Sequence, residues 1–395
     1  MKKRGFWGLV VCLLVTVALV AAGCGGGTAP EGEKEIVIGG IIDMTGPTGD
    51  VGAPYHDGAK AYVEYVNSQG GLDGSKIKLD VIDYAYDMDK AQEAYNRLVK
   101  RTGVPAILGW GTGDTDALKG FVAQDEIPYI SGSYSEYLTD ITQSPYNFLV
   151  AASYTDQTRI ALKWYYEQWG QDRAPKVAFV YNNTPFGTSH LEDAKAFAEE
   201  LGFEVVADQI IDLRALDATT QMLNLKNSAA DVAIIQGTSN MTATVLKDAR
   251  KLGVETQFIG LNWAFDEKVV ELAGAASEGY MGVVPFVFPG EDVPGMVDIK
   301  AYLDSKGKDF KDINQKFVQG WMSAMIMFEG VRLAGDDLTG PNIRAGLETM
   351  RDYSPAGLGA PVTFSDQSHR GTEYARIGQV LDGGITYLTD WISYK

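Results

Sequence analysis

The residues best suited to ligand chemistry lie in a glycine-rich stretch in the first third of the chain. A short apolar run over residues 104–108 leads into an alternation of small and functional residues: Gly109, Trp110, Gly111, Thr112 and Gly113. A helix is predicted to follow over residues 117–122. The backbone N–H groups of such a loop and the dipole of the following helix both favour negative charge. We therefore interpret this stretch as a loop that binds the carboxylate of a small ligand, with Thr112 adding a hydroxyl donor.

Two other interpretations of this stretch stay open. Glycines also serve an ordinary corner between a strand and a helix, with no ligand involved. A loop that binds nucleotide phosphates is a third interpretation. It has weak support, because the sequence contains neither a full G-x-G-x-x-G nor a G-K-[ST] ending here.

The N-terminal segment has the layout of an export signal. Residues 1–4 are basic, residues 6–20 are almost wholly apolar, and Ala21-Ala-Gly-Cys24 follows. This ending looks like the lipobox of bacterial lipoproteins, which predicts a signal peptide over residues 1–23 and an acylated Cys24. A plain signal peptide cleaved nearby is the alternative. Residues 24–34 then form a flexible tether.

Composition narrows the class of protein. The chain has two cysteines and a formal net charge of −18. Cys12 lies within the predicted signal, so neither a disulfide framework nor a cysteine-based metal site is expected. Nucleic acid is a poor candidate partner for so acidic an exported chain. A mature chain of about 370 residues exceeds what one core usually holds, which favours two lobes.

Strand and helix patterns alternate along most of the chain. Residues 35–42 and 77–82 are predicted strands, and residues 55–66 and 91–99 carry helical stripes. A second alternating run follows from about residue 150 to 260. Two such runs predict two α/β lobes, each a parallel sheet with helices on both faces. The later part is predicted to hold two helices, one over residues 317–333 and one capped by Thr339, and two closing strands, over residues 374–381 and 385–391.

Several motifs together resemble a known family. They are Ile41-Ile-Asp-Met-Thr-Gly-Pro47, Gly70-Gly-Leu-Asp-Gly74, Phe186-Gly187, Ala249-Arg-Lys-Leu-Gly253 and Gly359-Ala-Pro-Val-Thr-Phe364. In this order and spacing the chain resembles type I periplasmic binding proteins of ABC importers, in the branch that binds leucine, isoleucine and valine or amides. The resemblance covers about residues 36–388.

The resemblance implies a fold of two doubly wound, Rossmann-like lobes joined by three crossing strands. The crossings are expected near Ser153, Pro285 and Ser368. The N-terminal lobe would comprise residues 35–153 plus 285–368, and the C-terminal lobe residues 154–284 plus 369–395. The ligand would lie between the lobes, which close over it, and would be delivered to the permease subunits of an importer.

The resemblance also implies ligand contacts. A hydroxyl after the third strand and a hydroxyl pair after the fourth hold the carboxylate in amino-acid-binding members, and the opposite lobe adds an aromatic ring, a polar contact and an acid for the ammonium. The matching positions are Thr112 with Trp110 beside it, Ser133 and Ser135, then Phe186, Thr238 and Asn262.

Two positions depart from the pattern of the family. Asn262 stands where an acid binds the ligand's ammonium, and Val51 stands near where an aromatic residue is usual. One outcome is that Asp114, Asp116 or Asp266 replaces the missing acid. The other is that the ligand is a simple carboxylate or amide without an α-ammonium. We favour the second, because the Val51 departure also removes an amino-acid contact.

Other classes of function have less support. An exported hydrolase would need a nucleophile elbow, but G-x-S-x-G is absent. We expect the three histidines, His56, His190 and His369, to be surface or capping residues. The acids Asp83, Asp87 and Asp89 lack the pattern of a calcium loop, so neither a metal nor a cofactor is expected. A ligand sensor for a signalling partner stays open, since no residue excludes it.

Overall fold

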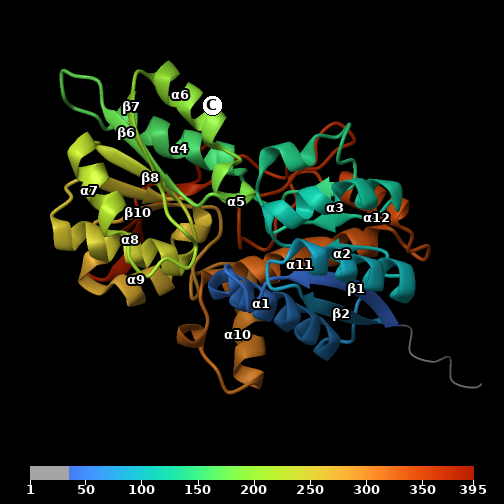
Figure 1. Cartoon of the computed structure of the whole chain (residues 1–395). Helices are drawn as coiled ribbons and strands as arrows, with labels where there is room; N and C mark the ends of the chain where they lie inside the picture. The colour runs from blue at the N-terminus through green and yellow to red at the C-terminus, as the bar shows by residue number, and fades with distance from the viewer. Residues whose placement is uncertain (1–34) are drawn as a thin grey trace, which may run out of the picture. The chain divides into compact units, whose positions relative to one another are not determined.

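The computed structural model describes residues 35–395, and their fold rests on two mainly parallel β-sheets. Figure 1 shows the first sheet with β1 and β2, and the second with β6, β8 and β10. The predicted signal peptide, the acylated Cys24 and the tether lie outside the described residues. Within residues 35–395, none of the helices combines the length and apolar character that a membrane crossing requires.

The first sheet has five parallel strands in the order β2-β1-β3-β4-β5. They are β1 (Glu35–Ile42), β2 (Lys76–Asp83), β3 (Ile107–Leu108), β4 (Tyr129–Ile130) and β5 (Asn147–Phe148). The β-branched run of β1 forms the centre of the core, where Ile38, Ile41 and Ile42 are fully buried. A central strand buried on both faces fits a continuous apolar run rather than an alternating one.

The helices that pack with this sheet come from two separate parts of the chain. The earlier ones are α1 (Gly49–Ser68), α2 (Met88–Tyr95), α3 (Thr112–Gln124) and the short turns η1 (Asn96–Thr102) and η2 (Glu136–Thr139). The later ones are α10 (Pro294–Ser305), η5 (Phe310–Asp312), α11 (Gln315–Leu333) and α12 (Gly340–Glu348). The helices predicted over residues 317–333 and after Thr339 are thereby confirmed.

Helices α1 and α11 approach each other backbone to backbone. A Cβ atom on Gly58 would lie 1.9 Å from the carbonyl oxygen of Phe317, and one on Gly320 would lie 1.8 Å from that of Tyr55. Only glycine permits this contact, so the two positions fix how α11 covers the first sheet. Helix α1 begins at Gly49, six residues before the predicted start, which places His56 inside the helix rather than at its beginning.

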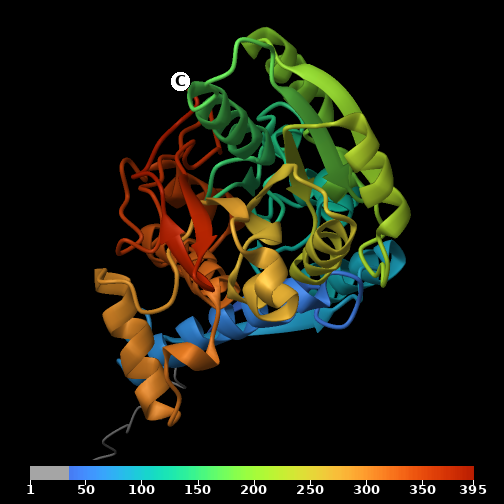
Figure 2. The ribbon, with the colours of Figure 1, turned by 90° about the vertical axis from the view of Figure 1, so that its left-hand side faces the viewer.

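The second sheet has seven strands in the order β12-β11-β10-β9-β8-β6-β7. They are β6 (Lys176–Tyr181), β7 (Glu204–Ile210), β8 (Val232–Gln236), β9 (Gln257–Gly260), β10 (Met281–Val284), β11 (Arg376–Leu381) and β12 (Gly384–Tyr387). Strands β6 to β10 run parallel, whereas β11 is antiparallel to both of its neighbours. Figure 2 shows this closing hairpin in red beside the yellow segments that precede it in the sheet.

Helices in the chain around these strands complete the second unit. They are α4 (Tyr154–Glu167), α5 (Pro185–Thr188), α6 (Leu191–Leu201), α7 (Thr219–Ser228), α8 (Ser239–Leu252), η3 (Asn262–Ala264), α9 (Glu267–Ala273) and η4 (Gly274–Ser277). The segment after β6, which carries the Phe186-Gly187 motif, is helical from Pro185 to Thr188. Pro185 opens a short helix there, because its fixed φ suits the first helical position.

The chain passes between the two sheets three times, and the passing segments pair with one another. The amide N–H of Leu149 donates to the carbonyl oxygen of His369 (2.9 Å), and that of Gly371 donates to the carbonyl oxygen of Leu149 (2.8 Å). The amide of Val287 donates to Leu358 (3.0 Å). The predicted α/β fold with two doubly wound units is confirmed, and the exact residue limits of the lobes stay predictions.

Candidate functional site

A small cavity lies between the two sheets, at loops and helix starts that follow their strands. Its volume is about 20 Å³, about the space of one water molecule. The wall contains residues from both units: Thr48, Val51, Tyr86, Trp110, Gly111, Gly132, Tyr154, Phe186, Thr238 and Trp263. Ligands of open α/β sheets bind at this kind of edge, beyond the carboxyl ends of the strands.

Aromatic rings occupy most of the space around this cavity. The rings of Trp110 and Trp263 meet edge to face with centroids 4.9 Å apart, and Tyr55 packs 5.2 Å from Trp110. Tyr154 lies edge to face with Phe186 at 5.7 Å. The rings come from both units, so a ligand bound among them would contact both.

A larger groove of about 450 Å³ lies elsewhere, between α1, α9, α10 and α11. Its lining is mostly charged, and the charged residues Asp57, Lys60, Lys308 and Lys311 are exposed. Ligand sites are usually concave and apolar, with a few converging polar groups. The small aromatic cavity fits that description better, so we take it as the candidate site.

The predicted carboxylate-binding residues lie beside one another at the beginning of α3. Thr112 is the first residue of this helix, and its hydroxyl oxygen lies 2.6 Å from that of Ser133. The amide of Ser135 donates to the Ser133 hydroxyl (3.3 Å), while the Ser135 hydroxyl itself has no partner. All three side chains are buried. The structure therefore brings Thr112 and Ser133 into contact and Ser135 next to them.

The glycines of this loop permit close packing. A Cβ atom on Gly109 would lie 1.8 Å from the ring of Tyr129, and one on Gly111 would lie 2.5 Å from a carboxylate oxygen of Asp114. Both glycines thus serve the corner itself, as the simplest interpretation of the sequence requires. Close packing at the corner is compatible with a role in ligand binding, because Gly111 also lines the cavity.

Asp114 occupies part of the helix terminus that we expected a ligand to use. One carboxylate oxygen accepts the Gly111 amide (3.1 Å), and the other accepts the hydroxyl of Tyr84 (2.6 Å). Asp114 is fully buried, and desolvation raises its pKa to about 7. The spacing of Gly111 and Asp114 fits a capping interaction, which is a local signal that could have been found in the sequence.

On the opposite wall, two of the predicted ligand-binding residues line the cavity and one does not. Phe186 and Thr238 line the cavity, and Thr238 stands just before α8 with a hydroxyl that has no partner. Asn262 is fully buried next to the lining residue Trp263 but is not itself part of the lining. Both polar atoms of its side chain lack partners, while its amide donates to the Gln157 side-chain oxygen (2.9 Å).

The acids that could replace the missing charge at Asn262 already have partners. Asp266 accepts the hydroxyl of Ser239 (2.8 Å) and the amide of Val269 (2.9 Å), which fixes it at the start of α9. Asp116 pairs with Lys119 at 2.7 Å on a partly exposed surface. Neither acid lines the cavity.

A buried lysine, Lys316, lies behind the aromatic wall, and we did not predict it from the sequence. The Lys316 ammonium, on α11, donates to the carbonyl oxygens of Asn262 and of Phe265 (3.2 Å). It also lies 5.5 Å from the centre of the Trp263 ring. Burial lowers the pKa of Lys316, against an opposing effect of Asp266 and Glu267. This lysine joins the first unit to the loop that carries Asn262 and Trp263.

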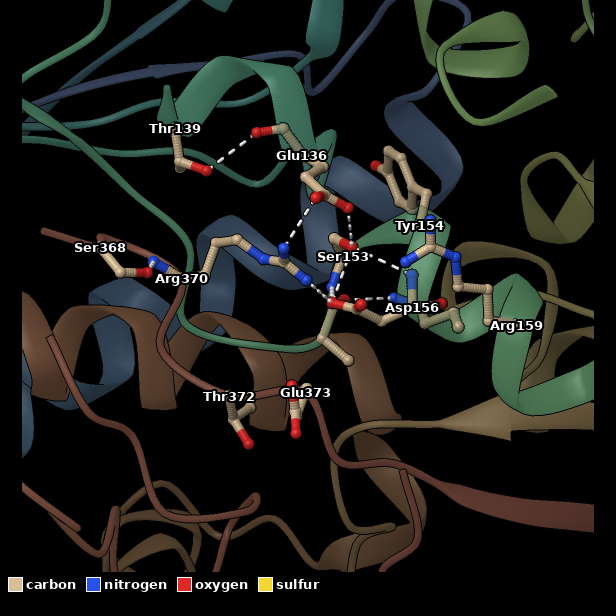
Figure 3. A network of polar contacts seen from close by, with 12 residues as sticks. Glu136, Thr139, Ser153, Tyr154, Asp156, Arg159, Ser368, Arg370, Thr372 and Glu373 are labelled. Atoms are coloured by element: carbon tan, nitrogen blue, oxygen red, sulfur yellow. Dashed lines mark hydrogen bonds and ion pairs between the residues drawn. The ribbon is translucent and has the colours of Figure 1, made fainter. Parts of the chain in front are cut away.

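Tyr154, another lining residue that the sequence analysis missed, is positioned from a crossing segment. Its hydroxyl accepts the indole N–H of Trp263 (3.1 Å), and its amide donates to the carbonyl oxygen of Tyr134 (2.8 Å). It is the first residue of α4, where Ser153 and Asp156 form a reciprocal cap. Figure 3 shows Arg370 reaching into this cap.

Arg370 bonds acids from two different segments at the crossing. One guanidinium nitrogen lies 2.5 Å from a carboxylate oxygen of Asp156, and another lies 2.7 Å from Glu136. Asp156 is fully buried, so this cation is its counter-charge. The network fixes the beginning of α4 and therefore the ring of Tyr154.

The expectation of surface or capping histidines is wrong for His369, whereas His190 does stand at a helix start, although it is buried. His190 is buried just before α6 as its N-cap residue, without a side-chain cap, and desolvation lowers its pKa to about 3. His369 is buried against the ring of Phe148 (3.8 Å) and bonds the Asn147 carbonyl and Glu348, both at 3.0 Å. His56 is partly exposed beside Asp57. Over residues 35–395 no group of three or more histidine, cysteine or acidic side chains is placed to hold a metal ion.

Comparison with known proteins identifies the family. A model of the periplasmic binding protein family matches residues 35–384, almost the whole described chain. The chain belongs to this family. It is 26% identical to the Leu/Ile/Val-binding protein homolog 1 of Brucella melitensis biotype 1 over 265 residues, which are 67% of this chain and 69% of that protein.

Other relatives and solved structures agree with this family assignment. A leucine-, isoleucine-, valine-, threonine- and alanine-binding protein of Pseudomonas aeruginosa is 23% identical over 296 residues, 74% of this chain and 77% of the relative. The crystal structure of a branched chain amino acid ABC transporter from Thermus thermophilus with bound valine superposes with a TM-score of 0.86 at 26% identity, covering 91% of this chain and 97% of that one. An ABC transporter substrate-binding protein from Aeropyrum pernix gives a TM-score of 0.84 at 28% identity, covering 91% and 96%.

These findings confirm the predicted family and the predicted class of function, a binding protein that delivers its ligand to an ABC importer. The family also places the protein outside the cytoplasm, as we expected from the N-terminal segment.

Proposed function

We propose that the protein captures a small carboxylate or amino-acid-like ligand in the aromatic cavity and passes it unchanged to the permease of its importer. The observation that supports this proposal is the cavity itself, whose wall comes from both units. A ligand bound there would hold the lobes together, which suits recognition of the loaded form by a permease. The lobes would comprise residues 35–153 plus 285–368 and residues 154–284 plus 369–395.

The hydroxyl cluster would bind the polar end of the ligand. Thr112, Ser133 and Ser135 offer three buried hydroxyls, and the first two directly follow the lining residues Gly111 and Gly132. The Ser135 hydroxyl and one hydroxyl of the Thr112–Ser133 pair, whose other member donates within the pair, could donate a hydrogen bond to a carboxylate or an amide oxygen. Trp110 and Phe186 would enclose the apolar part of the ligand.

The opposite unit would add polar contacts from Thr238 and Asn262. The Thr238 hydroxyl and both side-chain polar atoms of Asn262 are buried without partners. Buried polar groups normally find partners, and a ligand is one way to supply them.

Polar contacts between the units would stabilise the closed arrangement around the ligand. The Asn240 amide donates to Asp50 on α1 (2.8 Å), and the Gln315 amide on α11 donates to Glu267 on α9 (3.1 Å). Closure would be a hinge motion at the crossing segments. Small-angle scattering should then show a smaller radius of gyration once a ligand is bound.

We also propose that Cys24 is acylated and holds the protein at a membrane surface. This proposal is supported by the run of small residues, Ala21-Ala-Gly, that directly precedes the cysteine. Acyl chains give membrane attachment without a spanning helix. Mass spectrometry of the mature protein should find a lipidated N-terminus at Cys24, and an unmodified N-terminus elsewhere would contradict the anchor.

A thermal-shift screen of amino acids, small carboxylates and amides tests the main proposal. A ligand present at several hundred times its dissociation constant should raise the free energy of unfolding by about 3–4 kcal/mol. Calorimetry on the hits should show one site per chain and recovery of the unaltered compound. Turnover of a bound compound would show that the protein is an enzyme instead.

A further inference from the structure

We propose that two carboxylates at the boundary between the units, those of Asp50 and Glu267, oppose closure while they are charged, so that a mildly acidic medium promotes closure. This inference rests on the hinge closure of the proposed function. Asp50 lies in the first turn of α1, and Glu267 is the first residue of α9. Neither residue lines the aromatic cavity, so the effect does not depend on which ligand binds there.

Each carboxylate accepts a backbone amide from the opposite unit. Asp50 accepts the amide of Asn240 on α8 (2.8 Å), and Glu267 accepts that of Gln315 at the start of α11 (3.1 Å). Figure 2 shows the yellow helices of the second unit beside the blue α1. Because the two partners of each bond belong to different units, opening would break both bonds and expose both carboxylates to water.

One negative and one positive side chain face Asp50 from the elements packed against it. Asp266, just before α9, repels the Asp50 carboxylate, whereas Lys316 on α11 attracts it. The other groups that face it, the Asn240 amide and the Thr238 hydroxyl, are uncharged. One oxygen of the Asp50 carboxylate is buried without a hydrogen-bond partner. Closure therefore takes this charge out of water and towards Asp266 with incomplete compensation.

The carboxylate of Glu267 meets the same two charges. Asp266 precedes it in the chain and repels it, whereas Lys316 attracts it. The Lys316 ammonium also donates to the side-chain oxygen of Gln315 (2.9 Å), besides the two backbone carbonyl oxygens of the loop before α9. One buried ammonium thus faces three acids at this boundary: Asp50, Asp266 and Glu267. Closure gathers an excess of negative charge there, and protonation of a carboxyl would reduce it.

Both carboxyls border grooves on the outer side of the boundary, so the medium can supply protons to them. Asp50 lines a groove of about 520 Å³, and Glu267 lines the charged groove of about 450 Å³. Arg214 and Lys247 also line the first groove, where Arg214 donates to the carbonyl oxygen of Thr45 (3.3 Å). The second groove has equal numbers of lysines and further acids: Lys60, Lys268, Lys308 and Lys311 with Asp57, Glu64, Glu271 and Asp312.

The pKa values of the two carboxyls set the direction of the effect. Burial raises the pKa of Asp50 from 3.8 to about 6 and that of Glu267 from 4.5 to about 7, although the amide bonds lower both. In the open arrangement water replaces the opposite unit, so we expect ordinary values. A group whose pKa is higher in the closed form takes up a proton on closing, which favours closure as pH falls below that pKa. A protonated carboxyl still accepts the amide through its carbonyl oxygen, so the bond survives.

The size of the effect follows from the same values. At pH 5.5, Asp50 would favour closure about fourfold and Glu267 about thirtyfold relative to pH 8, so the closing constant should rise about a hundredfold. The protein is exposed to the pH of the medium, because its family places it outside the cytoplasm.

Small-angle scattering of the ligand-free protein at pH 8 and pH 5.5 tests the inference. We expect a smaller radius of gyration at pH 5.5, corresponding to a closing constant at least tenfold larger. Asp50→Asn combined with Glu267→Gln keeps the shapes and removes the charges, so this double variant should be compact at both pH values. Asp87→Asn is the matched control, because Asp87 is an exposed acid that accepts the amides of Asp89 and Lys90 within its own unit. It should respond to pH as the unmodified protein does, and circular dichroism should confirm that all proteins are folded at both pH values.

Two results would overturn the inference: a radius of gyration that is the same at both pH values, and a full response to pH in the double variant. Leucine, added at pH 8 as a probe ligand, separates the inference from the function on which it rests. If leucine compacts the protein and acid does not, the inference is wrong while ligand capture stands. If acid compacts the unmodified protein but not the double variant, the inference stands whether or not leucine binds. If neither acid nor leucine changes the radius of gyration, the inference fails together with the proposed hinge closure.

Discussion

Replacing Arg370 by glutamine should destabilise the protein through the buried carboxylate of Asp156. The guanidinium bonds Asp156 at 2.5 Å and Glu136 at 2.7 Å, and the side chains of Arg370, Asp156 and Glu136 are 29%, 0% and 33% exposed. A hydrogen bond between charged groups contributes about 1.5–3 kcal/mol when buried, whereas an exposed pair contributes about 0.2–1 kcal/mol. Asp156 keeps its bonds to Ser153, at 2.8 Å from the hydroxyl and 3.2 Å from the amide. The expected loss in free energy of unfolding is therefore about 2–4 kcal/mol.

Urea unfolding at pH 7, followed by circular dichroism, measures this loss. Arg332→Gln is the matched control, because Arg332 also bonds a carboxylate with two nitrogens (2.8 and 2.6 Å, to Glu329) but is 43% exposed. We expect the control to lose less than about 1 kcal/mol. Adding Asp156→Asn to Arg370→Gln should recover at least about 1 kcal/mol relative to additivity, since no buried charge is then left unpaired. If Arg370→Gln and Arg332→Gln lose the same amount, our assignment of Arg370 as the counter-charge is refuted.

Three further predictions follow from the site and the packing. Thr112→Val keeps the shape of the side chain and removes the hydroxyl beside Ser133, so calorimetry should show binding weakened about ten- to a hundredfold. Burial lowers the pKa of His190 from its ordinary value of 6.5 to about 3, so its contribution to stability is present above pH 6.5 and is lost as pH falls from about 6.5 towards 3. His190→Gln should flatten that part of the curve of unfolding free energy against pH. Gly320→Ala would place a methyl group 1.8 Å from the Tyr55 carbonyl oxygen, so thermal melts should show about 1–3 kcal/mol of destabilisation, and an unchanged midpoint would contradict the close contact of α1 with α11.

The fold was predictable from the sequence because its main signals are local. The apolar run of β1 and the helix that starts at Gln315 are visible in residue patterns alone. The early start of α1 was not predictable in the same way, because Gly49 and Pro54 are typical of loops. The structure shows that Asp43 organises this start by bonding Thr48, at 2.9 Å to its amide and 2.7 Å to its hydroxyl.

The candidate site was only partly predictable, for a physical reason. The contact of Thr112 with Ser133 joins the first residue of α3 to the segment after β4, so a family pattern suffices to suggest it. Trp263 and Tyr154 are 109 residues apart in the chain, and nothing local marks either as part of the wall. Lys316 was missed because lysine is almost never fully buried, and two of the three acceptors of its ammonium are carbonyl oxygens of a distant loop, at Asn262 and Phe265.

The contacts of the Trp263 ring with other rings of the protein compete with contacts to a bound ligand. Trp263 packs against Trp110 (4.9 Å), Tyr134 (6.1 Å) and Tyr55 (6.2 Å), all of which belong to the other side of the cavity. Each aromatic pair contributes about 0.5–1.5 kcal/mol, so separating the three costs about 1.5–4.5 kcal/mol. A ligand must first displace these contacts, and the cost lowers its apparent affinity roughly 10- to 2,000-fold. The packing of these rings thus raises the ligand concentration needed for half-saturation by the same factor for every ligand that must separate them.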